Sequence, residues 1–183
     1  MKFEAKEITL KNGQKCILRS PVPADAAQMI EMRIKTAGET EFLMNYPEEL
    51  IDYPLEKQEN FIKHAVESEN EFMLVAVVDG MLIGNCSVSF HTKIKTRHRG
   101  EIGIAILKEY WGLGVGNMFF EELIKVAHNH SGTTQLELEV LEGNYRAIHL
   151  YEKYGFETVA FKPDAIRLKD GTMLKVFLMI KKL

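Results

Sequence analysis

The sequence is organised around a run of glycines that lies between an apolar strand pattern and a helical pattern. Residues 101–107 read Glu-Ile-Gly-Ile-Ala-Ile-Leu, glycines follow at positions 112, 114 and 116, and a helical run continues over 117–128. Glycine adopts positive φ without steric strain and lets bare backbone approach a ligand. The free N–H groups of a helix's first turn bind phosphate, because the positive end of the helix dipole lies behind them. This stretch therefore predicts an anion-binding loop.

Two common nucleotide-binding motifs do not fit this loop. The dinucleotide fingerprint needs a further glycine where this chain has Asn117, and no Gly-Lys-Ser/Thr follows to make a nucleotide P-loop. A tight turn that simply joins a strand to a helix is the structural alternative. The loop alone predicts an anion site without identifying the anion.

Composition is typical of a globular protein, with 46% hydrophobic and 27% charged residues. The length of 183 residues predicts one domain, residues 1–183. A net charge of −3 gives no general attraction to nucleic acid or to an anionic membrane, so we expect neither as a partner. We see no signal-peptide pattern and no apolar run near the roughly 18 residues of a membrane span. Cys16 and Cys86 lack metal-ligand spacing, which favours reduced thiols in a cytoplasmic protein without a bound metal.

Apolar periodicity and turn residues predict the secondary structure. The expected elements are strands at 7–10 and 14–18, helices at 24–36 and 54–68, strands at 71–78, 81–90 and 101–107, a helix at 116–130, a strand at 134–140, a helix at 144–154, and strands at 156–161 and 172–181. Gly38 is expected to end the first helix. The residues expected on the core side of the second helix are Leu55, Phe61, Ile62, Ala65 and Val66. The order ββααβββαβαββ predicts an α/β fold with a mixed sheet flanked by helices.

A second pattern lies on the short helix near the C-terminus. Asn144, Ala147 and Tyr151 recur at helical spacing and share one face, and Gly155 and Phe156 follow. This face presents a carboxamide near the helix start and a phenol further along. Taken alone, the pattern favours a structural interpretation, namely an N-cap asparagine, core residues and a glycine stop.

Together the two patterns resemble the GNAT superfamily of N-acetyltransferases. In that family an Arg/Gln-x-x-Gly-x-Gly/Ala loop binds acyl-CoA pyrophosphate, and an Asn-x-x-Ala-x-x-x-Tyr-x-x-x-Gly-Phe helix flanks the pantetheine arm. Gly114-Val-Gly116 matches the first motif, and the residues from Asn144 to Phe156 match the second. The element order fits the family fold from about residue 15 to the end. Trp111 departs from the family, which usually has Arg or Gln at this position.

The resemblance implies acetyl-CoA as the cosubstrate. Backbone groups near Ile106 and Leu107 are the expected pantetheine and oxyanion contacts, and the N–H groups of 112–117 are expected to hold the phosphates despite Trp111. The full set of implied cofactor contacts is Ile106, Leu107, Gly112, Leu113, Gly114, Val115, Gly116, Asn117, Asn144, Ala147 and Tyr151.

The resemblance also implies direct attack of an amine on the thioester within a ternary complex. An amine of pKa about 10 must lose a proton, and a thiolate of pKa about 8.5 gains from a proton donor. Tyr151 occupies the donor's position in the family, with a buried structural phenol as the alternative. Glu101 resembles the glutamate that some members use as a base; the alternative is an exposed residue paired with Arg97 or Arg99. Two further glutamates, Glu137 and Glu139, are weaker rivals.

The segment 39–53 bears on the acceptor, since it carries Glu39, Glu41, Glu48, Glu49 and Asp52 but no Lys or Arg. Such charge favours a cationic acceptor, such as a polyamine, an aminoglycoside-like amine or a protein N-terminus. A solvated surface loop explains the composition equally well. We also keep two other hypotheses, a non-catalytic acyl-CoA sensor and a nucleotide-binding regulator. The oligomeric state stays open, with a homodimer among the alternatives.

Overall fold

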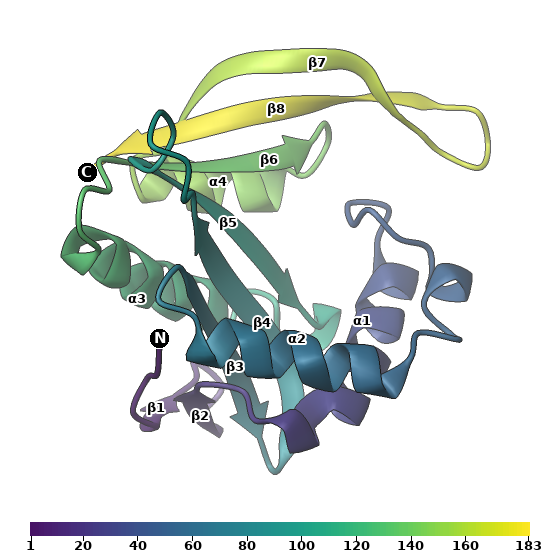
Figure 1. Cartoon of the computed structure of the whole chain (residues 1–183). Coiled ribbons are helices and arrows are strands. Elements are labelled where there is room, and N and C mark those ends of the chain that lie inside the picture. The colour runs from purple at the N-terminus through teal and green to yellow at the C-terminus, as the bar shows by residue number, and fades with distance from the viewer.

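The computed structural model describes residues Met1–Leu183 and has one eight-stranded sheet at its centre, in the order β1-β2-β3-β4-β5-β6-β8-β7 (Figure 1). The strands are β1 (Lys6–Thr9), β2 (Lys15–Arg19), β3 (Glu71–Val78), β4 (Met81–Phe90), β5 (Arg99–Ile106), β6 (Gln135–Leu141), β7 (Glu157–Arg167) and β8 (Met173–Lys182). The helices are α1 (Ala26–Glu39), α2 (Leu55–Glu67), α3 (Val115–Asn129) and α4 (Tyr145–Lys153), with short 3₁₀ turns η1 (Pro23–Asp25), η2 (Pro47–Glu49) and η3 (Lys108–Tyr110). The predicted order of strands and helices is confirmed.

Turn chemistry accounts for both predicted hairpins. Gly13 adopts φ 87° between β1 and β2, and Asp79 and Gly80 adopt φ 49° and 80° between β3 and β4. Two consecutive positive φ values match the right-handed twist of the flanking strands. Both hairpins pair in antiparallel fashion.

β5 and β6 separate soon after they begin. Their parallel pairing covers only Arg99–Glu101 against Gln135–Glu137, while β5 continues to Ile106 and β6 to Leu141. Figure 1 shows β5 running away from β6 and towards the helices. The gap leaves room for a ligand inside the sheet, near the C-terminal ends of the two strands.

Side-chain alternation divides β5 between two faces. A Cβ added to Gly100 would touch Val88, Phe90 and Leu136, and Phe90 stacks on His130 immediately after α3. Gly100 and the isoleucines at 102, 104 and 106 therefore face α3. Glu101, Gly103 and Ala105 face the opposite side. Because β3 is buried on both faces from Phe72 to Val78, helices cover both sides of the sheet.

Three local expectations are wrong. Gly38 lies inside α1 and does not end it; a Cβ there would make an ordinary van der Waals contact with Pro47 Cγ at 3.5 Å. On α2 Leu55 and Phe61 are 48% and 49% exposed, whereas Gln58 is 1% exposed; Ile62 and Ala65 are buried as expected. β7 extends beyond residue 161 to Arg167, since an edge strand tolerates Pro163 and an irregular pairing at Asp164 (φ 47°).

None of the helices combines the length and the apolar character that crossing a membrane requires.

Candidate active site

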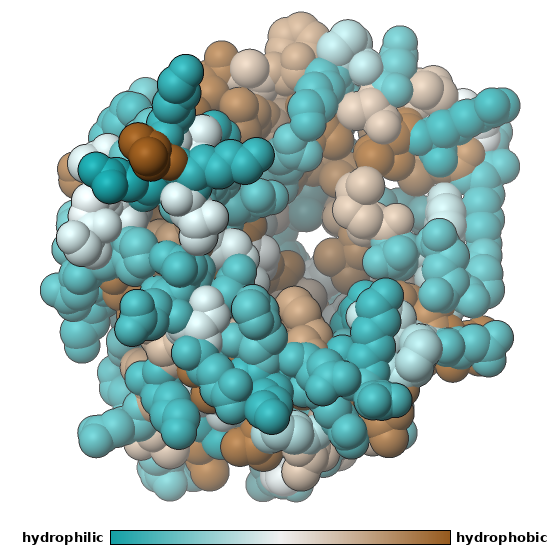
Figure 2. Space-filling view, viewed as in Figure 1, coloured by the Kyte–Doolittle hydropathy of each residue, from teal (hydrophilic) through white to brown (hydrophobic).

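A cleft of about 580 Å³ opens where β5 and β6 separate. Its walls come from β5, β6, the glycine loop, α4 and the chain that follows α1. Figure 2 shows this face of the molecule hollowed near its centre, with apolar residues among those at the rim. Of the predicted site residues, the cleft is lined by Glu101, Ile106, Gly112, Gly114, Gly116, Asn117, Asn144, Ala147 and Tyr151.

The glycine loop forms a cradle of unpaired backbone donors. Gly112 and Gly114 adopt φ 78° and 102°, and Gly114 is the N-cap of α3. No N–H group from residue 112 to 117 donates to another group of the protein. The loop is held in place from behind, because the Lys11 N–H donates to Leu113 O at 3.1 Å. Consecutive free donors at the start of a helix suit a phosphate or pyrophosphate.

Close packing brings α4 against the cradle. A Cβ on Gly116 would lie 2.9 Å from Leu150 Cδ2, so the absence of a side chain lets α3 and α4 meet. Val115 is buried beneath the loop and Leu113 is half-buried; neither side chain lines the cleft. Leu113 and Val115 could therefore contact a ligand only through their backbone N–H groups.

One predicted backbone donor is already used within the protein. The Leu107 N–H donates to Ile83 O at 2.9 Å, and the Leu107 side chain is buried. An oxyanion contact near Ile106 and Leu107 would therefore need a backbone group other than this N–H. A β-type hydrogen bond beyond the end of β5 could not be inferred from the sequence, because it depends on where β4 stops.

Tyr151 combines burial with a hydroxyl that has no partner. Its side chain is 6% exposed and packs against Phe120 and Phe156, with ring centroids 5.3 Å and 6.4 Å away. Its hydroxyl makes no hydrogen bond within the protein. Because no fully buried polar side-chain atom lacks a partner, this oxygen is accessible from the cleft that the residue lines. Burial raises the pKa of Tyr151 to about 12, so the phenol keeps its proton at neutral pH. The geometry suits a hydrogen-bond donor to a ligand.

Asn144 caps α4 and also lines the cleft. Its Oδ1 accepts the Ala147 N–H at 3.3 Å, as an N-cap should. The carboxamide NH₂ makes no hydrogen bond within the protein and is free to donate to a ligand. Both interpretations of Asn144 are therefore compatible with the geometry.

Glu101 is exposed and lies on the face opposite α3. It does not pair with Arg97 or Arg99, because the Arg99 guanidinium binds both oxygens of Glu137, at 2.5 Å and 2.8 Å. His91 Nε2 lies 3.6 Å from the same carboxylate. His91, Glu101 and Glu137 thus bring potential ligand atoms within 4.8 Å of one another, but a guanidinium already neutralises the buried member.

The second alternative to Glu101 as the base, Glu139, also forms an ion pair. Glu139 Oε1 accepts Lys162 Nζ at 2.5 Å. Glu101 is consequently the carboxylate of the cleft lining that has no cationic partner.

Sequence reasoning missed Arg146. Its guanidinium lies 4.9 Å from the centre of the Trp111 ring, and a Cβ on Gly112 would be 3.8 Å from its Nη1. Trp111 is itself fixed, since its Nε1 donates to Ile106 O at 2.8 Å. Arg146 lines the cleft and forms no ion pair. The sequence does show an arginine as the third residue of the motif that begins at Asn144. Only the fold shows that this arginine lies beside Trp111.

The sequence is that of a known family. The sequence model described as the Acetyltransferase (GNAT) family matches residues 35–156, about two thirds of the chain. The chain belongs to the GNAT family. The resemblance inferred from the glycine loop and the α4 pattern is confirmed.

Individual relatives agree with the GNAT assignment. The chain is 31% identical over 108 residues to the L-amino acid N-acetyltransferase AaaT of Escherichia coli, covering 59% of this chain and 66% of that protein. It is 32% identical over 107 residues to an N-alpha-acetyltransferase of Saccharolobus solfataricus, covering 54% of this chain and 64% of that protein. Each match thus spans less than two thirds of the curated relative's own length.

Solved structures confirm the fold. A GNAT acetyltransferase of Streptococcus pneumoniae superposes with a TM-score of 0.86 at 28% identity, covering 92% of this chain and 99% of that one. The putative acetyltransferase yncA of Salmonella typhimurium, solved with acetyl-CoA, gives a TM-score of 0.77 at 20% identity, covering 92% and 94%.

The residues of this GNAT chain fit an acyl-CoA. The donors of 112–117 suit a pyrophosphate, and Lys11 and Arg146 line the same cleft as cations without ion-pair partners. The remaining lining is largely apolar, which suits the pantetheine arm. Donors, cations and apolar walls therefore occur together in the one cleft.

Proposed function

We propose that this GNAT chain transfers an acetyl group from acetyl-CoA to a primary amine, by direct attack within a ternary complex. The observation that carries the proposal is the unpaired, protonated Tyr151 hydroxyl in the same cleft as a cradle of unpaired N–H groups. When bound, acetyl-CoA supplies the thioester carbon that the amine attacks.

Glu101 and Tyr151 divide the proton chemistry. The Glu101 carboxylate accepts a proton from the acceptor ammonium, directly or through water, so that the amine nitrogen can form the new N–C bond. As the C–S bond breaks, the Tyr151 hydroxyl donates a hydrogen bond to the departing sulfur. Because a phenol of pKa about 12 is a weaker acid than a thiol of pKa about 8.5, hydrogen-bond donation is favoured over full proton transfer. Nitrogen loses two protons in all, one from the ammonium to Glu101 and one after the N–C bond has formed. One proton is taken up by the departing thiolate through water and the other is released to solvent, so the products are an amide, a thiol and one free proton.

The names of the relatives support a primary amine as the acceptor. One is named an L-amino acid N-acetyltransferase and another an N-alpha-acetyltransferase, so both names describe acetyl transfer to nitrogen. For this chain we propose the same acceptor group, on a small amine or on a protein N-terminus.

Amine-dependent thiol release tests the function. We expect wild-type protein to release CoA thiol faster with at least one amine of a panel than with buffer alone. If acetyl-CoA binds but no amine accelerates thiol release, the chain is a sensor of acyl-CoA and not a transferase. A melting temperature raised by ATP or NAD but not by CoA would support a nucleotide-binding regulator instead.

Arg146→Gln is expected to weaken acetyl-CoA binding about tenfold, because a charge-assisted hydrogen bond to phosphate is lost. The effect should shrink at high salt. Calorimetry of acetyl-CoA at two salt concentrations measures both. The matched control is Arg167→Gln, since Arg167 is exposed on β7 and does not line the cleft. Equal affinities of the two variants would show that Arg146 makes no contact with phosphate.

A further inference from the structure

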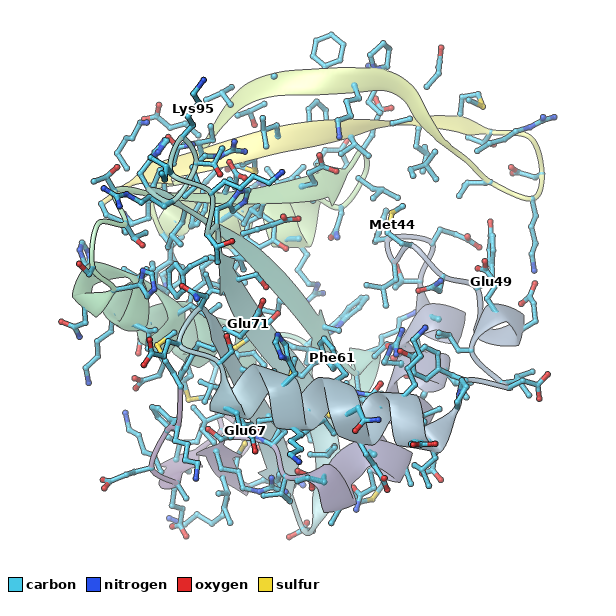
Figure 3. The ribbon with its side chains drawn as sticks, in the orientation of Figure 1. Met44, Glu49, Phe61, Glu67, Glu71 and Lys95 are labelled. Carbon is cyan, nitrogen blue, oxygen red and sulfur yellow. The ribbon has the colours of Figure 1, made fainter.

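The segment after α1 turns apolar residues, not its carboxylates, towards the cleft. Thr40, Phe42, Leu43 and Met44 line the cleft, whereas none of the five acidic residues of 39–53 does. Figure 3 shows Met44 at the tip of this segment and Phe61 on α2, on different sides of the central hollow. Both are unusually exposed for apolar residues, at 71% and 49%.

Most of the carboxylates of this segment have structural partners elsewhere. Glu39 accepts the Lys108 N–H at 2.7 Å, and Glu49 accepts the Tyr46 N–H at 2.7 Å. Glu48 pairs with Lys169. These three carboxylates stabilise the loop, and none of the five acidic residues that favoured a cationic acceptor lines the cleft.

The apolar wall is fixed in position. Phe42 packs against the turn before α4, where a Cβ on Gly143 would lie 3.6 Å from its ring. Tyr46 joins the segment to the turn between β7 and β8, because its hydroxyl accepts the Lys169 N–H at 3.1 Å and the Lys169 ammonium lies 4.1 Å from the ring centre. A wall held at both ends is preorganised for a ligand.

The charge available to an acceptor is one carboxylate. Glu101 is the lining carboxylate without a cationic partner, and it lies on the face opposite α3, away from the unpaired cation Arg146 over Trp111. One ammonium can pair with Glu101. A second ammonium on the same acceptor would have to lose water against Phe42, Leu43 and Met44 without a partner, which is unfavourable.

We propose that the acceptor is a monoamine with a compact apolar substituent beside the amino group. The α-amino group of an apolar amino acid, or of a peptide that begins with one, has this chemistry. The proposal rests on the proposed function and narrows it: Glu101 receives the amine, and the wall from Phe42 to Met44 receives the substituent.

The test compares kcat/KM for methioninamide and a methionyl dipeptide with lysinamide and putrescine. We expect the two apolar acceptors to exceed the two dications by about tenfold or more. Free methionine, which has the α-carboxylate that methioninamide lacks, is compared with the dipeptide to separate a free amino acid from a peptide terminus. A dication preferred by the wild type overturns the proposal while leaving acetyl transfer intact. Absence of turnover with every amine, despite acetyl-CoA binding, removes the proposed function itself and this proposal with it.

Two methionine variants test whether Met44 contacts the apolar substituent of the acceptor. Met44→Glu should reduce kcat/KM for methioninamide about tenfold and raise the relative use of putrescine. Met81→Glu is the control, because Met81 is 63% exposed and lies outside the cleft lining. Equal shifts in acceptor preference for the two variants would contradict the assignment of Met44.

Discussion

Tyr151→Phe is expected to lose about 100-fold in turnover while its affinity for acetyl-CoA stays close to that of the wild type. The substitution removes a hydroxyl that has no partner in the protein and keeps the ring that packs on Phe120 and Phe156. Steady-state thiol release gives the turnover, and calorimetry gives the affinity. Since burial holds the pKa of Tyr151 near 12, its ionisation should cause no loss of turnover between pH 7 and about 10.

The control for this prediction is Tyr145→Phe. Tyr145 begins the same helix, is 67% exposed and does not line the cleft. It should retain wild-type turnover. If Tyr151→Phe did the same, the phenol would be a structural residue of α4 and its proposed catalytic role would be wrong.

Gly114→Ala is expected to weaken acetyl-CoA binding by about 10- to 100-fold, through loss of one or more charge-assisted hydrogen bonds. Its Cβ would have space, the nearest atom being Met118 Cε at 4.0 Å, so the effect is conformational. At φ 102° an L-residue is strained, and relief of that strain turns the N–H groups of the loop away from one another. Calorimetry of acetyl-CoA measures the loss.

A second glycine at positive φ separates binding from stability. Gly132 has φ 80° with nothing within 4 Å of an added Cβ, and it lies in the turn after α3. Gly132→Ala should lower the melting temperature comparably and leave acetyl-CoA affinity unchanged. An equal loss of affinity in both variants would mean that the cradle has no special role.

The fold could be predicted from sequence because its signals are local. Asp79-Gly80 supplies a turn with the required backbone angles, and the alternation of 134–140 defines a strand without reference to its neighbours. The glycine loop likewise carries its conformation in its own residues. The GNAT resemblance added the connection to α4, which lies far away along the chain.

The sequence-based predictions that failed concern contacts that depend on tertiary structure. The sequence could not show that Arg99 binds Glu137 and leaves Glu101 free, nor that Arg146 stacks on Trp111. The net negative charge of residues 39–53 is evident from the sequence. The direction in which each of these side chains points is not, because it depends on distant partners such as Lys169. Gln58 is buried because Arg33 and Met29 on α1 meet its carboxamide, which helical periodicity alone does not indicate.

The central claim is acetyl transfer from acetyl-CoA to an amine in this cleft. The most direct measurement gives wild-type protein acetyl-CoA labelled with a heavy isotope in the acetyl group, together with methioninamide, and analyses the products by mass spectrometry. We predict labelled N-acetylmethioninamide in an amount equal to the thiol released, and its near absence with Tyr151→Phe over the same time. Thiol release accompanied by labelled free acetate, without labelled amide, would contradict the account.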